Sequence, residues 1–333
     1  MRLEISRKNR AGIGGMAALA AVTAFGLVSS VAVGQAGGEK KQGDAPQSTA
    51  RKSAGPQAGQ ETFSSAEEAS HALVKAVRNN DQETLLKVLG RDAKEIVSSG
   101  DDAEDKQDRD EFVQKYRRMH RLVIEPDGST TLYIGAENWP TPIPLMHKGD
   151  AWYFDTGAGK QEILYRRVGR NELAAIQVCR ELVDAEKEYH AKAHDGDAPQ
   201  YAQKLFSDPG KHNGLYWEES AGEEASPIGP LVAAAGSEGS GEQKLEPFQG
   251  YYFQILKGEG GKGRGARSYI EDGKMTRGFA FVAYPAEYRS SGVMTFVVNQ
   301  DGIVYEKDLG PKTAEIAKKL SRYDRDSSWR KAD

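Results

Sequence analysis

Residues 171–194 read NELAAIQVCRELVDAEKEYHAKAH and contain the longest run of helical periodicity in the chain. Apolar side chains recur there at three- and four-residue spacing, which places them on one face of an α-helix. This stripe consists of Leu173, Ile176, Cys179, Leu182, Val183 and Tyr189. Asn171 can cap the start of the helix, and Asp195-Gly196 can end it. A long helix with one apolar face needs a second layer to pack against.

Four β-rich runs after this helix supply the second layer. They are Tyr251–Leu256, Phe279–Tyr284, Val293–Asn299 and Ile303–Asp308. Gln300-Asp301-Gly302 joins the last two runs as a hairpin. One helix laid across an antiparallel sheet predicts an α+β domain over residues 169–329. In outline this pattern is similar to the globular head of a type IV pilin, although the helix lacks a membrane-spanning apolar half.

The residues before this helix predict three shorter helices. Ser64 or Ser65 is a suitable N-cap for the first, because Glu67 and Glu68 follow in its first turn. The second is expected over Glu83–Leu89, with Gly90 as its C-cap. The third is expected near Asp108–His120, where apolar side chains again share one face.

The sequence period changes to that of β-strands after His120. Pro126-Asp127-Gly128 separates one pair of β-rich runs, and Lys148-Gly149-Asp150 separates a second pair. Helices followed by an antiparallel meander predict a further α+β domain over residues 62–168. This order resembles the nuclear-transport-factor-2-like fold in outline. The chain is therefore expected to hold two domains, each with helices packed on an antiparallel sheet.

The first 61 residues indicate export. Arg2, Arg7, Lys8 and Arg10 precede an apolar run, and small residues follow it, so residues 1–36 are expected to be a signal peptide. Gly34 and Ala36 fit cleavage after Ala36, and Ser30 and Ala32 offer an earlier site. An uncleaved membrane anchor is the alternative. Residues 37–61 are rich in Gly, Gln, Lys and Pro and predict a disordered spacer. A periplasmic or secreted location follows.

Composition excludes several classes of function. The 333 residues include 45 Lys+Arg, 49 Asp+Glu and one Cys, and the formal net charge is −4. An acidic balance argues against general nucleic-acid binding, which needs a strongly positive surface. A single cysteine excludes an intrachain disulfide and any zinc cluster built from several cysteines of one chain.

Several long runs resemble those typical of domain-of-unknown-function family 2950. They are GRNELAAIQVC at 169–179, DPGKHNGLYW at 208–217, SPIGPL at 226–231 and SSGVMTFVVNQDG at 290–302. The resemblance extends over about residues 63–329. It implies a secreted or periplasmic bacterial protein, and it implies no catalytic residue, substrate or cofactor.

Asp155-Thr156-Gly157 resembles the catalytic loop of aspartic proteases and makes Asp155 a candidate catalytic residue. That chemistry needs two carboxylates that share a proton. The chain has no second Asp-Thr/Ser-Gly, so only a dimer could provide it. The alternative is that Asp155 and Thr156 cap the segment that follows them.

Three further patterns favour structural interpretations. The glycine-rich stretch Gly258–Gly265 lacks the helix and Lys-Ser/Thr pair of a phosphate loop and reads as a hairpin loop. His190 and His194 could share a helix face, but nothing fixes a third metal ligand. Cys179 lies in the apolar stripe and is expected to be buried and unreactive. We therefore expect no metal and no cofactor.

Aromatic side chains in the second domain are the candidate binding residues, namely Tyr216, Trp217 and Tyr252. Tyr252 alternates with Tyr251 and Phe253, so it lies on the opposite face of its strand. The combined interpretation is an exported, non-catalytic binding or assembly module, with envelope proteins or wall polymers as expected partners. Two alternatives remain: an exported hydrolase that uses Asp155, and a pilus-like assembly subunit. No integral membrane domain is expected after signal cleavage.

Overall fold

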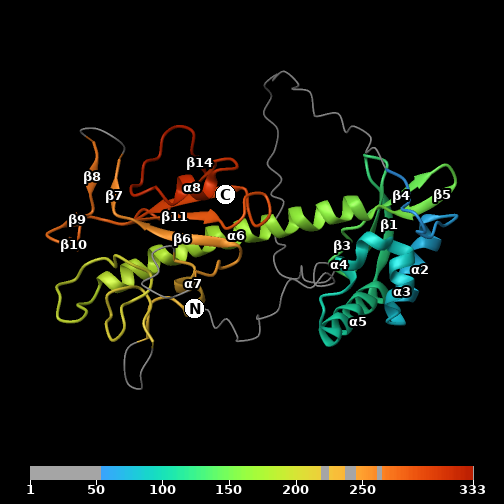
Figure 1. Cartoon of the computed structure of the whole chain (residues 1–333), viewed down its shortest axis with the longest axis horizontal. Helices are drawn as coiled ribbons and strands as arrows, with labels where there is room; N and C mark the ends of the chain where they lie inside the picture. Colours follow the sequence, from blue (N-terminus) through green and yellow to red (C-terminus); the bar gives the residue numbers. More distant parts are fainter. Residues whose placement is uncertain (1–53, 219–224, 237–244, 261–264, 333) are drawn as a thin grey trace, which may run out of the picture. The chain divides into compact units, whose positions relative to one another are not determined.

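The computed structural model describes residues 54–218, 225–236, 245–260 and 265–332 (Figure 1). The chain forms two compact units, Met1–Ile163 and Leu164–Asp333. The division falls inside helix α6 (Thr156–His190), as does the boundary expected between residues 168 and 169. The expected signal peptide, and the expected spacer as far as residue 53, lie outside the described residues.

Unit 1 consists of helices followed by a meandering sheet. Its elements are α2 (Ala66–Arg78), α3 (Gln82–Leu89), the 3₁₀-helix η1 (Arg91–Ala93), α4 (Lys94–Val97), α5 (Asp102–Arg118), β1 (His120–Ile124), β2 (Thr130–Ile134), β3 (Trp139–Pro140), β4 (Leu145–Lys148) and β5 (Ala151–Phe154). The strands pair in the order β1-β2-β4-β5, with β3 also on β2, and all pairs are antiparallel. Helices on an antiparallel sheet confirm the α+β prediction for this half.

Local caps explain where these helices begin and end. Ser65 Oγ accepts a hydrogen bond from Glu68 N at 3.1 Å, so Ser65 is the cap of α2. Gly90 has a φ of 89°, which allows the chain to turn sharply after α3, as predicted. The expected start of α5 at Asp108 is wrong. Asp101 caps the helix by accepting from Ala103 N and Glu104 N, and its first turns are too polar to show an apolar period.

The end of the expected spacer packs on unit 1 instead of being disordered. Glu61 N donates to Lys87 O at 2.8 Å, and Gln60 Nε2 donates to Phe154 O at 2.8 Å. The next strand-like contact is the antiparallel bridge of Phe63 with Trp152. These bonds satisfy backbone groups in the last turn of α3 and at the edge of β5, which explains why residues without apolar periodicity are ordered here.

Unit 2 is built around a five-stranded antiparallel sheet. Its elements after α6 are α7 (Pro230–Ala234), β6 (Tyr251–Leu256), β7 (Gly258–Glu259), β8 (Arg267–Ser268), β9 (Ile270–Glu271), β10 (Lys274–Met275), β11 (Ala280–Pro285), β12 (Met294–Asn299), β13 (Tyr305–Asp308), α8 (Thr313–Ala317) and β14 (Arg330–Lys331). The sheet order is β14-β13-β12-β11-β6. Phe281 of β11 lies opposite Ile255 of β6 and Val298 of β12.

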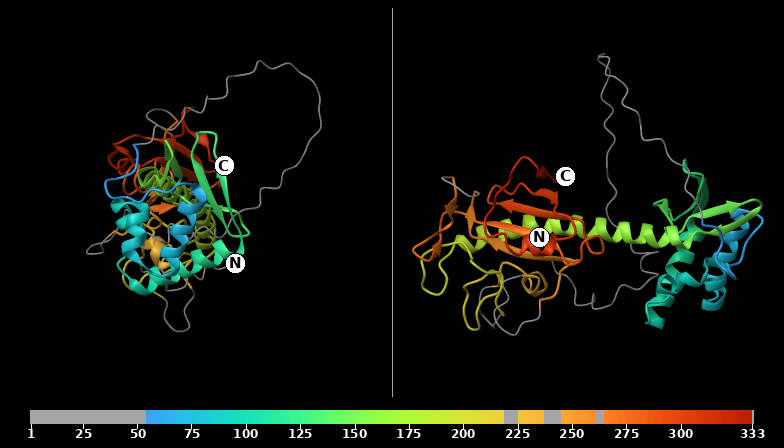
Figure 2. Two further views of the ribbon diagram at one scale, coloured as in Figure 1. Left: turned by 90° about the vertical axis from the view of Figure 1, so that its right-hand side faces the viewer. Right: turned by 45° about the horizontal axis from the view of Figure 1, so that its top comes forward.

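Both faces of this sheet are covered. Figure 2 shows α6 running along one face, while α8 lies against β11 on the other. All six residues of β11 are buried, which requires a layer on each side. The chain after α8 extends the outer layer, because Gln254 Nε2 donates to Leu320 O at 2.9 Å. At the sheet edge, Ala332 N donates to Val304 O at 3.0 Å and continues the pairing of β14 with β13.

Helix α6 begins at Thr156, so the expected start at Asn171 is wrong. Asn171 lies within the helix and its Nδ2 donates to Ser291 O at 2.8 Å. Glu172, which lies outside the predicted apolar stripe, accepts hydrogen bonds from Val293 N and Met294 N. Leu173, expected in the apolar stripe, is 65% exposed. These polar side chains at the start of the predicted stripe hold the segment before β12, so the buried stripe begins later.

Candidate functional site

Six aromatic and histidine side chains gather around the last turns of α6. We call this set, which consists of Tyr189, His190, His194, Tyr201, His212 and Trp217, the histidine–aromatic cluster. The rings of Tyr189 and His194 stack at 4.1 Å between centroids, and those of His190 and Tyr201 stack at 4.2 Å. The Trp217 ring lies edge-on to His212 at 4.7 Å and at 5.7 Å from His194. Half of the six histidines in the chain therefore lie in one place.

A reversal of the chain after α6 creates the cluster. Asp195 and Gly196 both have positive φ, at 50° and 81°, and this left-handed conformation is tolerated by Asp and favoured by Gly. His194 lies just before this turn, with its Nε2 3.1 Å from Tyr189 O. Helix α6 itself ends at His190, so the prediction that Asp195-Gly196 ends the helix is wrong; the pair reverses the irregular segment that follows the helix.

The loop of residues 207–214, called here the 207–214 loop, is fixed by its own hydrogen bonds. Asp208 N donates to Asn213 Oδ1 at 3.0 Å, and Asn213 Nδ2 returns a bond to Asp208 Oδ2 at 2.8 Å. Lys204 Nζ lies 2.8 Å from Asp208 Oδ1, and the bonds from Lys204 and Asn213 lower the pKa of that carboxyl. Gly214 is required because a Cβ there would lie 2.8 Å from the backbone of Phe206.

The end of α6 holds this loop through His212. Asp195 Oδ2 accepts a hydrogen bond from His212 N at 2.7 Å, and Asp195 Oδ1 lies 3.2 Å from His212 Nδ1. Tyr189 Oη donates to His212 O at 2.7 Å. His212 is thus held at its amide, its carbonyl and its ring. The ring itself stays about one-third exposed, at 32%, so the loop presents it to solvent.

Glu186 is a fully buried carboxyl beneath the cluster, at 0% exposure. Its Oε2 accepts a hydrogen bond from Ala202 N at 2.9 Å, whereas Oε1 makes no hydrogen bond among the described residues. Burial raises the pKa of Glu186 well above its ordinary value. Sequence reasoning missed this residue, because a glutamate between Ala185 and Lys187 reads as solvent-facing. The only available signal was its position on the same face as Leu182 and Tyr189.

The candidate binding residues occupy different places in unit 2. Trp217 belongs to the histidine–aromatic cluster and is 5% exposed. Tyr216 is half-buried, and its ring lies 5.0 Å from that of Phe206 next to the 207–214 loop. Tyr252 is half-buried on β6, where its ring lies 5.8 Å from Tyr284. The structure therefore brings Trp217 and Tyr216 to the loop and places Tyr252 on the sheet.

Asp155, the candidate catalytic residue, lies directly before α6. Its Oδ1 accepts a hydrogen bond from Ala158 N at 3.0 Å, which is the bond of an N-cap. Thr156 Oγ1 donates to Leu89 O, so the neighbouring hydroxyl is also in use. The bond from Ala158 N confirms the cap at Asp155, whereas Thr156 is the first residue of α6 and its hydroxyl ties the helix start to the end of α3 instead of capping the segment.

The remaining chemical motifs have structural surroundings. Cys179 is fully buried, and burial raises the pKa of its thiol to about 12. Gly258 and Glu259 pair antiparallel with β8, so strands flank the glycine-rich stretch, whose residues 261–264 lie outside the description. Within the described ranges, no group of three or more His, Cys, Asp or Glu side chains is arranged to hold a metal ion.

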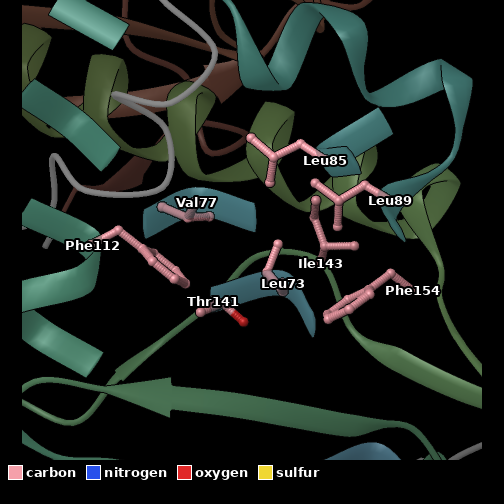
Figure 3. Close-up of a pocket in the computed structure, with 8 residues that line it drawn as sticks. All are labelled: Leu73, Val77, Leu85, Leu89, Phe112, Thr141, Ile143 and Phe154. Atoms are coloured by element: carbon pink, nitrogen blue, oxygen red, sulfur yellow. The ribbon is translucent and has the colours of Figure 1, made fainter. Parts of the chain in front are cut away.

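Unit 1 contains one small apolar cavity between its helices and sheet (Figure 3). It is lined by Leu73, Val77, Leu85, Leu89, Phe112, Thr141, Ile143 and Phe154. Its free volume is about 10 Å³, which is close to the minimum for one water molecule. Thr141 supplies the only polar side chain of this lining. The cavity is a packing gap, too small for an organic ligand.

Comparison with known proteins gives one match. A family model described as "Protein of unknown function (DUF2950)" matches residues 60–332. Neither the curated proteins nor the solved structures contain a significant match. The likenesses to nuclear transport factor 2 and to pilin heads therefore rest on element order alone. In the part of the chain that the structure describes, no helix is sufficiently long and apolar to span a bilayer.

Proposed function

We propose that this chain, which belongs to the DUF2950 family, is an exported, non-catalytic binding or assembly module of the cell envelope. The observation that carries the proposal is the 207–214 loop. Its internal hydrogen bonds and its attachment to α6 through His212 fix it before any partner arrives. A pre-organised loop loses little conformational entropy on binding, which is the main cost of recruiting a surface loop.

The side chains around this loop suit recognition of a partner. Tyr216 and Phe206 form a half-buried aromatic pair. His212, which lies between them in the sequence, is partly exposed. Aromatic side chains fixed by packing contribute large contact area at low entropic cost. Envelope proteins or wall polymers are the partners that we expect. Tyr252, on the sheet, is a second candidate contact.

Capture from envelope extracts tests the binding surface. Immobilised mature protein is compared with Tyr216→Ala, and Tyr165→Ala serves as the control because that tyrosine is 63% exposed elsewhere on α6. We expect capture of a defined partner to fall about tenfold or more in Tyr216→Ala, in line with an aromatic interface residue. Equal loss in both variants, or capture unchanged in both, would contradict the assigned surface.

The class of function has its own test. A hydrolase screen with Asp155→Asn as the control addresses the enzymatic alternative, because turnover abolished by that change would favour an acid-dependent hydrolase. Light scattering across a concentration series addresses assembly: reversible growth into higher oligomers would favour an assembly subunit. A protein that stays inactive in the screen and binds its partner through Tyr216 supports the binding module.

Export is tested on the product in cells. The arrangement of basic residues, apolar run and small residues supports cleavage after Ala36. Intact mass of the protein from periplasmic and culture fractions should give a chain that begins at Gly37. A full-length chain in the membrane fraction would favour the uncleaved anchor, and a full-length chain in the cytosol would refute export.

A further inference from the structure

The contacts between α6 and the 207–214 loop involve several groups that titrate. Tyr189 of α6 and Asp195 of the turn after it contact His212 of the loop. Glu186 of α6 holds Ala202, in the segment that leads to the loop. We propose that these contacts form a proton-dependent clamp, which holds the 207–214 loop on α6 when protonated and loosens it when deprotonated. This regulation concerns the loop of the proposed function, but the clamp itself can be measured without a partner.

The buried carboxyl supplies the first part of the argument. Glu186 receives one hydrogen bond, from Ala202 N, and the remaining oxygen has no partner within the described structure. Two neighbouring tyrosines, Tyr189 and Tyr201, have pKa values that are raised by burial and by the Glu186 charge. Neither side chain is a cation. A charge at Glu186 would therefore be buried without a counter-ion among these neighbours. The hydrogen bond from Ala202 N favours the charged form, but burial outweighs it and raises the pKa, so deprotonation favours opening of this site and release of residue 202.

His212 supplies the second part. Its ring faces Asp195, and its edge contact is with the neutral ring of Trp217. A protonated ring forms an ion pair with the Asp195 carboxylate, whereas a neutral ring keeps only a hydrogen bond. Asp197, the other nearby carboxylate of the turn, is bonded to Lys274 at 3.0 Å. Protonation thus strengthens the contact that fixes the loop.

The remaining histidines act in the same direction. His190 is the last residue of α6, and His194 lies against the carbonyl of Tyr189 near its end. The C-terminal end of a helix carries a partial negative charge that favours cationic side chains. His190 and His194 therefore lie where a cationic ring is favoured, which adds to the clamp in its protonated form.

Native-state hydrogen exchange on the full mature chain tests the clamp. The informative amides are Ala202 N and His212 N, which are bonded to clamp carboxyls, and Gly214 N, which is bonded to Ser207 Oγ inside the loop that the clamp holds. We expect their protection factors, corrected for the intrinsic effect of pH, to fall about tenfold or more between about pH 5.5 and 8.5, since one pKa unit corresponds to a factor of ten. Protection that does not change with pH would overturn the proposal.

Variants identify the groups responsible. Glu186→Gln keeps an acceptor for Ala202 N but cannot ionise, so most of the pH dependence at Ala202 should disappear. His212→Asn should remove the pH dependence of protection at Gly214. This variant also tests the clamp independently if Glu186→Gln fails to fold. His71→Gln, at an exposed histidine of α2, is the control and should leave the dependence unchanged. Dependence that survives both clamp variants would refute the assignment. A clamp that responds to pH in a protein that captures no partner would refute only the proposed function.

Discussion

The first turn of α6 is fixed by close packing, whereas its last turn is fixed by contacts of ionisable groups. The first turn has the Asp155 cap and Gly159, where a Cβ would lie 2.6 Å from Ile143 Cγ1. The last turn has Glu186, His190 and the contacts to His212. The difference teaches that one helix can be fixed by close packing at one end and by proton-dependent bonds at the other. Stability at the first end should therefore depend on side-chain volume, and stability at the second end should depend on pH.

The second half of α6 also packs on an apolar core, in addition to its contacts between ionisable groups. Leu182 is fully buried there, so Leu182→Ala should lower the free energy of unfolding by about 2–5 kcal/mol, through lost burial and the cavity left behind. Leu173→Ala is the control, because that leucine is 65% exposed on the same helix and should cost less than about 0.5 kcal/mol. Urea unfolding followed by circular dichroism gives both values. Similar losses would mean that the buried face of α6 is misassigned.

Two glycines of α6 test whether close packing fixes the first turn. Gly159→Ala should destabilise the protein by about 1–3 kcal/mol, because the new methyl group overlaps Ile143. Gly169→Ala meets nothing within 4 Å and should stabilise it by about 0.5–1 kcal/mol through helix propensity. Thermal unfolding of both variants should give shifts of opposite sign. Two stabilising shifts would show that Ile143 yields freely and that shape does not fix this end.

The cap at Asp155 should have a smaller effect. Asp155→Ala removes the acceptor for Ala158 N and should cost about 1 kcal/mol. Asp155→Asn keeps a capping oxygen and should stay within about 0.5 kcal/mol of the parent, since Asn and Asp cap about equally well. Denaturant unfolding at neutral pH measures both. Equal destabilisation by the two changes would point to a role for the charge itself.

Asp108 in α5 sharpens the comparison by placing a titrating group in unit 1. Burial, together with the charges of Glu104 and Glu111, raises the pKa of Asp108 to about 6. Because the pKa of Asp108 in the folded protein lies above the ordinary aspartate value of 3.8, stability is lost as pH rises through about 6. Asp108→Asn should therefore raise the urea midpoint at about pH 7.5 and leave it unchanged near pH 4.

The expected gain from Asp108→Asn is the smallest of the set, because that side chain is only partly buried and solvent screens its charge. Asp110→Asn is the matched control, since the Asp110 carboxyl is exposed and pairs with Lys106 on the surface. If the urea midpoints of the two variants changed equally with pH, Asp108 would not affect stability through its ionisation. The pH dependence would then be a property of the end of α6 alone.

Local signals explain how much of the fold was predictable. Ser65 as a cap, Gly90 as a stop and the turn at Pro126-Asp127-Gly128 each act through neighbouring residues, and each is found as expected. The start of α6 was not predictable in this way. Residues 156–170 contain three glycines and no clear apolar stripe, so their helix is decided by the Asp155 cap and by tertiary packing.

The candidate site was less accessible from the sequence than the fold. Trp217 could be singled out as an aromatic, but its neighbours His194 and His212 come from separate turns without periodicity. Glu186 looks like a surface glutamate until Ala202 N is placed against it. Contacts between residues far apart in irregular segments leave no repeating pattern, so only the folded chain brings them together.

The outer layer of unit 2 sets the order in which that unit can be completed. Helix α8 lies against β11 and Gln254 is bonded to Leu320, so residues late in the chain cover this face of the sheet. A nascent polypeptide cannot close this layer until those residues have left the ribosome. Until then β11 exposes one apolar face, which leaves the emerging polypeptide open to chaperones and to aggregation.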